Sequence, residues 1–183
     1  THRSLASRIA RAARARVLLP EYRLAPEQPF PAAVEDAVTC WRWLIAAGYA
    51  PDRLVIAGDS AGGGLALATL LALKAAGDAL PACAVALSPW TDLEATGPTA
   101  QPGAVVDPLL TPAGLHTSSL QYAAGHLRNP LASPLHGNLE GLPPLLIQVG
   151  TREVLLSDST RFAARAQAAG AEVTLEIEDG LIH

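Results

Sequence analysis

The feature that most constrains the fold is a short apolar run followed at once by a glycine-rich turn and a helical run. The apolar run covers residues 54–57, the turn covers residues 58–63 (GDSAGG), and a helix is predicted over 61–76, ended by Gly77. The turn has the spacing Gly-x-Ser-x-Gly, which places a serine at the apex of a sharp strand-to-helix turn flanked by glycines. We therefore expect Ser60 to project above the carboxyl end of a sheet, where it can act as a nucleophile.

A glycine-rich turn before a helix can also cradle a phosphate, because helix N-termini attract anions. However, no Lys follows these glycines as it does in a phosphate-binding loop, and the chain has no Gly-x-Gly-x-x-Gly. The apolar run before the turn and the helix after it favour the nucleophile.

The rest of the chain alternates between strand-like and helix-like segments. Further strands are predicted over 82–87, 144–149 and 173–177, and further helices over 32–47 and 159–169. Continuous apolar runs such as the first two are typical of strands buried on both faces of a parallel sheet. The alternation predicts an α/β fold with an open, mainly parallel sheet flanked by helices, and residues 1–183 as a single domain.

Residues 89–143 interrupt this alternation with a long insertion rich in Pro and Gly, in which one helix is predicted over 111–124. Long irregular insertions form lids or binding loops, or are disordered. This one follows the carboxyl end of a strand, where ligands bind in α/β sheets. We expect it to shape a substrate pocket, with Trp90 and Tyr122 as candidate wall residues; ordinary core packing is the alternative for both.

Composition excludes several classes of protein. Half of the 183 residues are hydrophobic and 16% are charged, with a net charge of -4, which argues against a disordered chain and against a nucleic-acid-binding protein. The one basic cluster consists of Arg3, Arg8, Arg11, Arg14 and Arg16, interleaved with apolar residues at helical spacing. This pattern predicts the solvated face of an amphipathic helix, with a membrane or nucleic-acid patch as the alternative.

No metal site is predicted. Cys40 falls in a predicted helix and Cys83 in a predicted strand, without zinc-ligand spacing, so both are expected to be buried free thiols. His116, His126 and His136 lie in the Pro/Gly-rich stretch, fit no metal-ligand pattern and are interpreted as loop residues.

The sequence has no apolar run long enough for a transmembrane helix and no recognisable signal peptide. It lacks methionine and begins at Thr1 in what reads as the middle of a helix. We expect it to be part of a longer protein with a cytoplasmic location.

A serine hydroxyl becomes a good nucleophile only when a base removes its proton and an acid orients that base. His183 follows the last predicted strand and is the candidate base. Two carboxylates follow the strand over 144–149. Glu153 lies in the turn directly beyond it, whereas Asp158 lies in the first turn of a predicted helix, where carboxylates commonly serve as caps. Glu153 is favoured as the acid, and Asp158 is the alternative.

Several further segments carry a family resemblance. They are residues 21–33 (EYRLAPEQPFPAA), 58–63 (GDSAGG), 88–93 (SPWTDL), 129–135 (NPLASPL), 141–144 (GLPP) and 150–158 (GTREVLLSD). With these segments, which are spread over nearly the whole chain, the sequence resembles the bacterial hormone-sensitive-lipase-like carboxylesterases, a family with the α/β-hydrolase fold.

The resemblance implies that Ser60 is the nucleophile, His183 the base and Glu153 the acid, at a position where Asp is commoner in relatives. It implies a serine carboxylesterase that hydrolyses short to medium acyl esters through an acyl-enzyme. It also implies no cofactor, a small-molecule ester as partner, no stable membrane insertion, and a homodimer as one option.

The family also carries a His-Gly-Gly-Gly motif, upstream of the first matching segment, whose N–H groups supply most of the oxyanion hole. This resemblance implies that those donors precede Thr1, and that Ala61 N–H is the donor within the present chain. The 183 residues alone are therefore expected to be weakly active.

Two other functions remain open from the sequence. The first is an amidase or peptidase on the same fold, since no residue reports how a leaving amine would be protonated. The second is a non-catalytic ligand-binding protein, because this fold also serves as a plant hormone receptor. In that receptor the triad histidine is lost, whereas His183 is present here.

Overall fold

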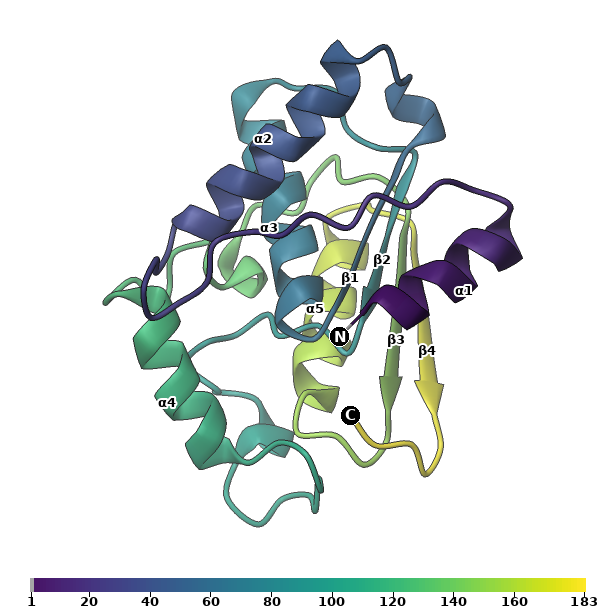
Figure 1. Cartoon of the computed structure of the whole chain (residues 1–183). Coiled ribbons are helices and arrows are strands. Elements are labelled where there is room, and N and C mark those ends of the chain that lie inside the picture. Colours follow the sequence, from purple (N-terminus) through teal and green to yellow (C-terminus); the bar gives the residue numbers. More distant parts are fainter. Residues whose placement is uncertain (1) are drawn as a thin grey trace.

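The structure, a computed structural model, describes residues 2–183. Figure 1 shows its helices and strands in chain order. The helices are α1 (Arg3–Ala13), α2 (Ala32–Ala46), α3 (Ala61–Ala76), α4 (Pro112–Ala123) and α5 (Leu156–Ala168), with short 3₁₀ turns at Pro51–Arg53 (η1), Pro98–Ala100 (η2) and Pro134–His136 (η3). The strands are β1 (Val55–Asp59), β2 (Cys83–Leu87), β3 (Leu145–Gly150) and β4 (Val173–Glu178).

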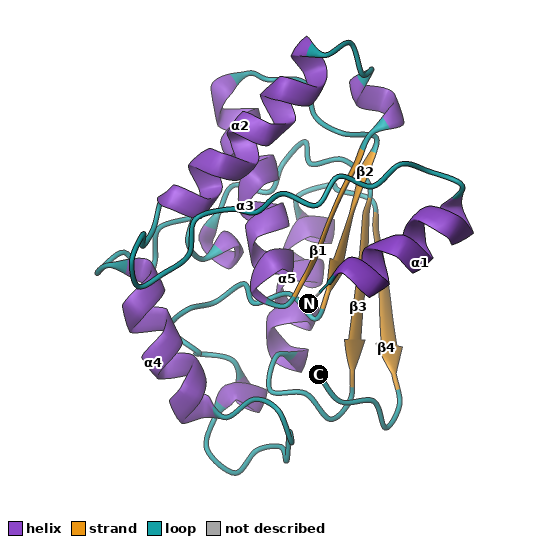
Figure 2. Ribbon diagram, in the orientation of Figure 1, coloured by secondary structure: helices purple, strands orange, loops and turns teal. Residues whose placement is uncertain are grey.

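The four strands form one parallel sheet in the order β1-β2-β3-β4, as the alternating pattern predicts (Figure 2). Asp59 pairs with Leu87, Leu87 with Gln148, and Gly150 with Glu178. The carboxyl ends of all four strands therefore lie along one edge of the sheet. The segments that follow the strands, and the functional side chains predicted on them, are brought to that edge.

The main core lies between the sheet and one layer of helices. Helix α3 packs on β1 and β2, and α5 packs on β3 and β4, while α2 packs against α3. Leu67 and Leu70 of α3 and Phe162 of α5 are fully buried in one cluster with Ala86 and Ile147 of the central strands. This layer fixes α3, and therefore the turn that precedes it.

The arginine-rich segment forms α1 on the other side of β1 from α2 and α3 (Figure 1). The helix carries Arg3, Arg8 and Arg11 as predicted, but Arg14 ends it in a left-handed conformation and Arg16 lies beyond it, so the prediction is wrong for these two residues. None of the residues of α1 is buried, and both Leu5 and Ile9 are exposed. No described helix combines the length and apolar character that crossing a bilayer requires.

The insertion over 89–143 is ordered and has its own apolar cluster. Trp90, Leu115 and Ala123 are buried there with Leu155, which follows the turn after β3. Helix α4 begins where predicted, because the Thr111 hydroxyl accepts a hydrogen bond from the Gly114 N–H and caps it. The insertion is thus packed against the edge where the strands end.

Three sequence predictions need correction. Helix α5 begins at Leu156 rather than Ser159, because the turn after β3 is short and leads directly into the helix. His116 lies in α4 and His136 in η3, so the interpretation of these two histidines as loop residues is wrong. Cys40 and Cys83 are free thiols but only half-buried.

The two glycines of the Gly-x-Ser-x-Gly turn have unequal steric roles. A Cβ at Gly58 would overlap the Gly62 carbonyl group, whereas a Cβ at Gly62 would meet no neighbouring atom. We predict that Gly58→Ala lowers the free energy of unfolding by about 3 kcal/mol. Gly62→Ala, the matched control within α3, should leave it unchanged or raise it by up to about 1 kcal/mol.

Urea denaturation of the two variants measures both values. Equal stability of the two variants would contradict the close backbone approach at Gly58.

Candidate active site

Ser60 stands at the tip of the turn between β1 and α3 with a strained backbone. Its φ of 58° and ψ of -120° are unusual for a residue with a side chain. Two hydrogen bonds hold this conformation: the Ser60 N–H donates to the Leu87 carbonyl at 2.8 Å, and the Trp90 N–H donates to the Ser60 carbonyl at 3.1 Å. The last residue of β2 and the segment that follows it therefore hold the backbone of Ser60 in place.

His183 lies between Ser60 and Glu153. Its Nε2 is 2.8 Å from Ser60 Oγ, and its Nδ1 is 2.8 Å from Glu153 Oε2. The segment before it is held beside the turn after β3, because the Arg152 N–H donates to the Leu181 carbonyl at 3.0 Å. The chain end thus lies at the carboxyl edge of the sheet (Figure 1), and the three residues form one hydrogen-bonded chain.

Glu153 is almost fully buried, at 2% exposure, and both of its carboxylate oxygens are bonded. Oε1 accepts hydrogen bonds from the Gly150 N–H at 2.6 Å and from the Ser88 hydroxyl at 2.8 Å. Oε2 faces His183. Two donors on one oxygen leave the other free to receive the Nδ1–H of the imidazole.

The electrostatics favour a charged pair. Burial opposes ionisation of Glu153, but the hydrogen bonds from His183, Gly150 and Ser88 outweigh it and hold the pKa of Glu153 below its usual value. The hydrogen bond to Glu153 raises the pKa of His183 above its usual value, against the effect of burial. Both shifts stabilise an imidazolium beside a carboxylate.

Asp158 has a different place in the structure. It lies in the first turn of α5, as expected, and is 1% exposed. Its Oδ2 accepts hydrogen bonds from the N–H groups of Thr91 and Asp92, both at 2.8 Å. Burial raises the pKa of Asp158 to about 7. The structure therefore brings Glu153 to His183 and uses Asp158 to fasten the segment after β2 to α5.

Ala61 is the first residue of α3, directly after the serine. An N–H group in the first turn of a helix has no acceptor within the helix, and the helix dipole gives this end partial positive charge. The Ala61 N–H is thus placed where negative charge can be stabilised beside Ser60.

A cavity of about 250 Å³ opens beside Ala61. Its apolar lining includes Leu65 of α3 and, from the insertion, Trp90, Leu93, Tyr122 and Leu131. Tyr122 packs edge-to-face against Phe30 with ring centroids 6.2 Å apart, and burial raises the pKa of Tyr122 to about 12. Both aromatic residues predicted from the sequence line this cavity; their contact with a substrate stays a prediction.

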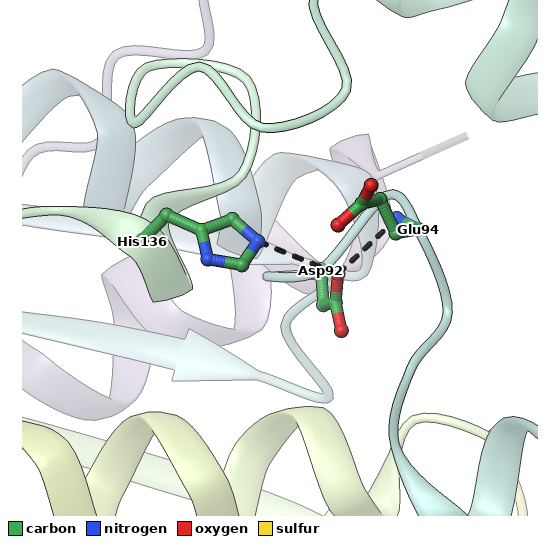
Figure 3. Close-up of side chains that lie close together, drawn as sticks. All are labelled: Asp92, Glu94 and His136. Atoms are coloured by element: carbon green, nitrogen blue, oxygen red, sulfur yellow. Dashed lines mark hydrogen bonds and ion pairs between the residues drawn. The ribbon is translucent and has the colours of Figure 1, made fainter.

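A second cluster of polar side chains consists of Asp92, Glu94 and His136 (Figure 3). Their donor atoms are close enough together to suggest a metal site, and His136 Nε2 is 3.7 Å from Asp92 Oδ1. Arginines already pair with both carboxylates: Arg161 with Asp92 at 2.9 Å and Arg128 with Glu94 at 3.3 Å. The two carboxylates are thus held in ion pairs, of which Arg161–Asp92 joins the insertion to α5, whereas the buried His136 Nε2 has no hydrogen-bond partner among the described residues.

Sequence reasoning missed two residues beside the acid. One is Ser88; the other is Asp107 of the insertion, whose Oδ2 accepts from the Val154 N–H at 3.1 Å and whose Oδ1 accepts from Leu109 and Leu110. Ser88 directly follows a strand at the edge that carries the other functional residues, a signal that could have found it. Asp107 follows an irregular stretch, and no local pattern marks it.

Comparison with known proteins defines the class. The whole chain, residues 1–183, matches the family with the alpha/beta hydrolase fold. The chain therefore belongs to the α/β-hydrolase family, and the fold predicted from the sequence is confirmed.

The relatives are named as hydrolases, among them esterases. An acetyl-hydrolase of Streptomyces hygroscopicus is 50% identical over 100% of this chain and 62% of its own length. An esterase of Acinetobacter venetianus is 35% identical over 99% of this chain and 60% of its own length. The chain thus spans about three-fifths of the length of these relatives.

Solved structures of esterases are also similar to this chain. A crystal structure described as an esterase of the bacterial hormone-sensitive lipase family superimposes with a TM-score of 0.97 at 51% identity, covering 100% of this chain and 62% of that one. The esterase EstE5, soaked with p-nitrophenyl butyrate, gives 0.96 at 49% identity over the same shares. The resemblance to this esterase family is confirmed.

The buried carboxyl group of Asp158 predicts a pH-dependent stability. Its pKa rises from 3.8 to about 7 on folding, so the stabilising protonated form is fully present below about pH 4 and is lost as the pH rises through about 7. Asp158→Asn keeps an oxygen acceptor for both N–H groups without a charge. The stability of this variant relative to the parent should therefore increase between about pH 4 and 7.

Urea denaturation at several pH values measures this difference. A constant difference across the range would mean that Asp158 does not change its protonation state there.

Proposed function

We propose that the whole protein is a serine carboxylesterase in which Ser60 attacks the ester, His183 transfers the proton and Glu153 orients His183. The observation that carries this proposal is the chain of two 2.8 Å contacts from Ser60 Oγ through the imidazole to Glu153 Oε2. A nucleophile, a base and an orienting acid are the minimum set for acyl transfer by a serine hydroxyl.

In the first half-reaction, Ser60 Oγ forms a bond to the ester carbonyl carbon while its proton passes to His183 Nε2. The tetrahedral intermediate then collapses, the bond to the alkoxy oxygen breaks, and His183 returns the proton to the departing alcohol. Glu153 stabilises the imidazolium that exists between these steps, and Ala61 N–H donates to the oxyanion. The product of this half is an acyl-Ser60 ester and a free alcohol.

In the second half-reaction, water replaces the alcohol. His183 takes a proton from the water as its oxygen bonds to the acyl carbon, and returns that proton to Ser60 Oγ as the acyl bond breaks. A carboxylic acid leaves and the site is restored. No other reactant is needed.

The cavity beside Ala61 supports the proposal that the substrate is a small molecule. Its volume of about 250 Å³ and its apolar wall suit a short to medium acyl chain. The names of relatives, an acetyl-hydrolase of Streptomyces hygroscopicus and an ethyl acetate hydrolase of Pseudomonas putida, point the same way. A cytoplasmic location and a homodimer stay predictions.

Substitution of the three residues in the whole protein tests the proposal. Ser60→Ala should lower kcat/KM for p-nitrophenyl butyrate by about 10⁴-fold or more. Glu153→Gln should lower kcat by about 10⁴-fold, because an amide no longer holds the required imidazole tautomer.

Asp158→Asn is the matched control for Glu153→Gln, since it makes the same chemical change in a second buried carboxylate. It should keep most of the activity. Full activity of Ser60→Ala would contradict the proposal, and preferred cleavage of the butyryl anilide over the ester would indicate an amidase instead.

Tyr122 should limit the length of the acyl chain. Tyr122→Ala removes a large wall residue, so the ratio of kcat/KM for p-nitrophenyl decanoate to that for the butyrate should rise about tenfold. Tyr49→Ala is the control, because Tyr49 is an exposed tyrosine outside the cavity lining and should leave the ratio unchanged. An unchanged ratio in Tyr122→Ala would exclude this wall from acyl recognition.

A further inference from the structure

Ser88 has an unusual backbone conformation at the end of β2. Its φ is 42°, in the left-handed region that residues with a side chain rarely adopt. Glycine would adopt this conformation without steric conflict. A serine at this position therefore indicates a role for its hydroxyl group.

Two hydrogen bonds join Ser88 to β3 and to the turn that follows β3. Its N–H donates to the Gln148 carbonyl of β3 at 2.7 Å, which continues the sheet pairing by one residue. Its hydroxyl donates to Glu153 Oε1 at 2.8 Å. The residue before it, Leu87, accepts the hydrogen bond from the Ser60 N–H. Ser88 thus links the strand that clamps the nucleophile to the carboxylate that faces His183.

We propose that Ser88 is a positioning residue that fixes which oxygen of Glu153 faces His183. This proposal rests on the proposed function, in which Glu153 orients His183. A glutamate has one more rotatable bond than an aspartate, and its carboxylate can present either oxygen. Donation from Ser88 and from Gly150 N–H to the same oxygen, Oε1, holds the group in one orientation and leaves Oε2 for the imidazole.

The hydroxyl of Ser88 is neutral, so its effect on His183 is transmitted through the orientation of Glu153. The acidic groups that raise the pKa of His183 are Glu153 first, then Asp59 and Asp107. Removing the Ser88 hydroxyl leaves all three charges in place. Loss of the hydroxyl also raises the proton affinity of Glu153, which by itself would raise the pKa of His183. A lowered pKa of His183 would therefore report a changed geometry of the Glu153 hydrogen bond.

The test uses Ser88→Ala and Ser88→Gly in the whole protein. Both substitutions remove the hydroxyl. Glycine also removes the steric strain of a side chain in the left-handed conformation, so the glycine variant keeps the test valid if the alanine variant folds poorly. Both should lower kcat for p-nitrophenyl butyrate about tenfold with KM unchanged. Both should also lower the pKa of the His183 imidazole, followed by NMR of its ring nitrogens.

Two further variants complete the design. Ser159→Ala also removes a buried serine hydroxyl, one that donates to the carbonyl of Leu155, the residue before α5, and should leave the titration of His183 unchanged. In the background of Glu153→Gln, Ser88→Ala should produce no additional loss of kcat, because the carboxylate that it positions is gone.

The outcomes separate the two proposals. Parental kcat and an unchanged His183 pKa in both Ser88 variants, with Glu153→Gln still impaired, would overturn the role of Ser88 and leave the proposed function intact. Parental kcat in Glu153→Gln itself would overturn the proposed function.

Discussion

The parallel register of the four strands is the constraint on which the site depends. Because β1, β2, β3 and β4 pair in chain order and end together, Ser60, Ser88, Glu153 and His183 lie at one edge although the chain between them is long. The end of β2 connects the two sides of the site. Leu87, its last residue, bonds to the backbone of Ser60, and Ser88, the next residue, bonds to β3 and to Glu153. A shift of this register by one residue would separate the nucleophile from the acid.

The two buried carboxylates after β3 show how surroundings set chemistry. Glu153 and Asp158 are both nearly inaccessible. Glu153 has a neutral donor, a backbone N–H and an imidazole around it, and its pKa falls below the usual value. Asp158 has two backbone donors, but burial outweighs them and, with a smaller contribution from the negative charge of Asp92, raises the pKa of Asp158 to about 7. The surroundings of Glu153 favour a charged carboxylate beside His183, whereas Asp158 joins the segment after β2 to α5.

Much of this architecture can be predicted from the sequence because it is locally encoded. The apolar runs mark the strands, and residues 58–63 mark the turn that carries Ser60. The order of serine, acid and histidine follows from their places after successive strands. Ser88 directly follows a strand at the same edge, so its place could have been predicted in the same way, because β2–β3 pairing brings it to Glu153. Asp107 could not, because its partner Val154 lies 47 residues away and only the packed insertion brings the two together. The pairing of Asp92 with Arg161 likewise depends on tertiary packing. The helical place of His116, in contrast, already follows from the helix predicted over 111–124.

The proposed mechanism requires that Ser60 becomes acylated during turnover. The most direct measurement mixes the whole protein with p-nitrophenyl butyrate, quenches with acid within milliseconds to seconds, and locates the added butyryl mass by peptide mapping. We expect a butyryl group on the peptide that contains Ser60, with fragment ions that assign it to Ser60, and its disappearance as the substrate is exhausted. A butyryl group carried by another residue during turnover, with Ser60 unmodified, would contradict the proposed mechanism.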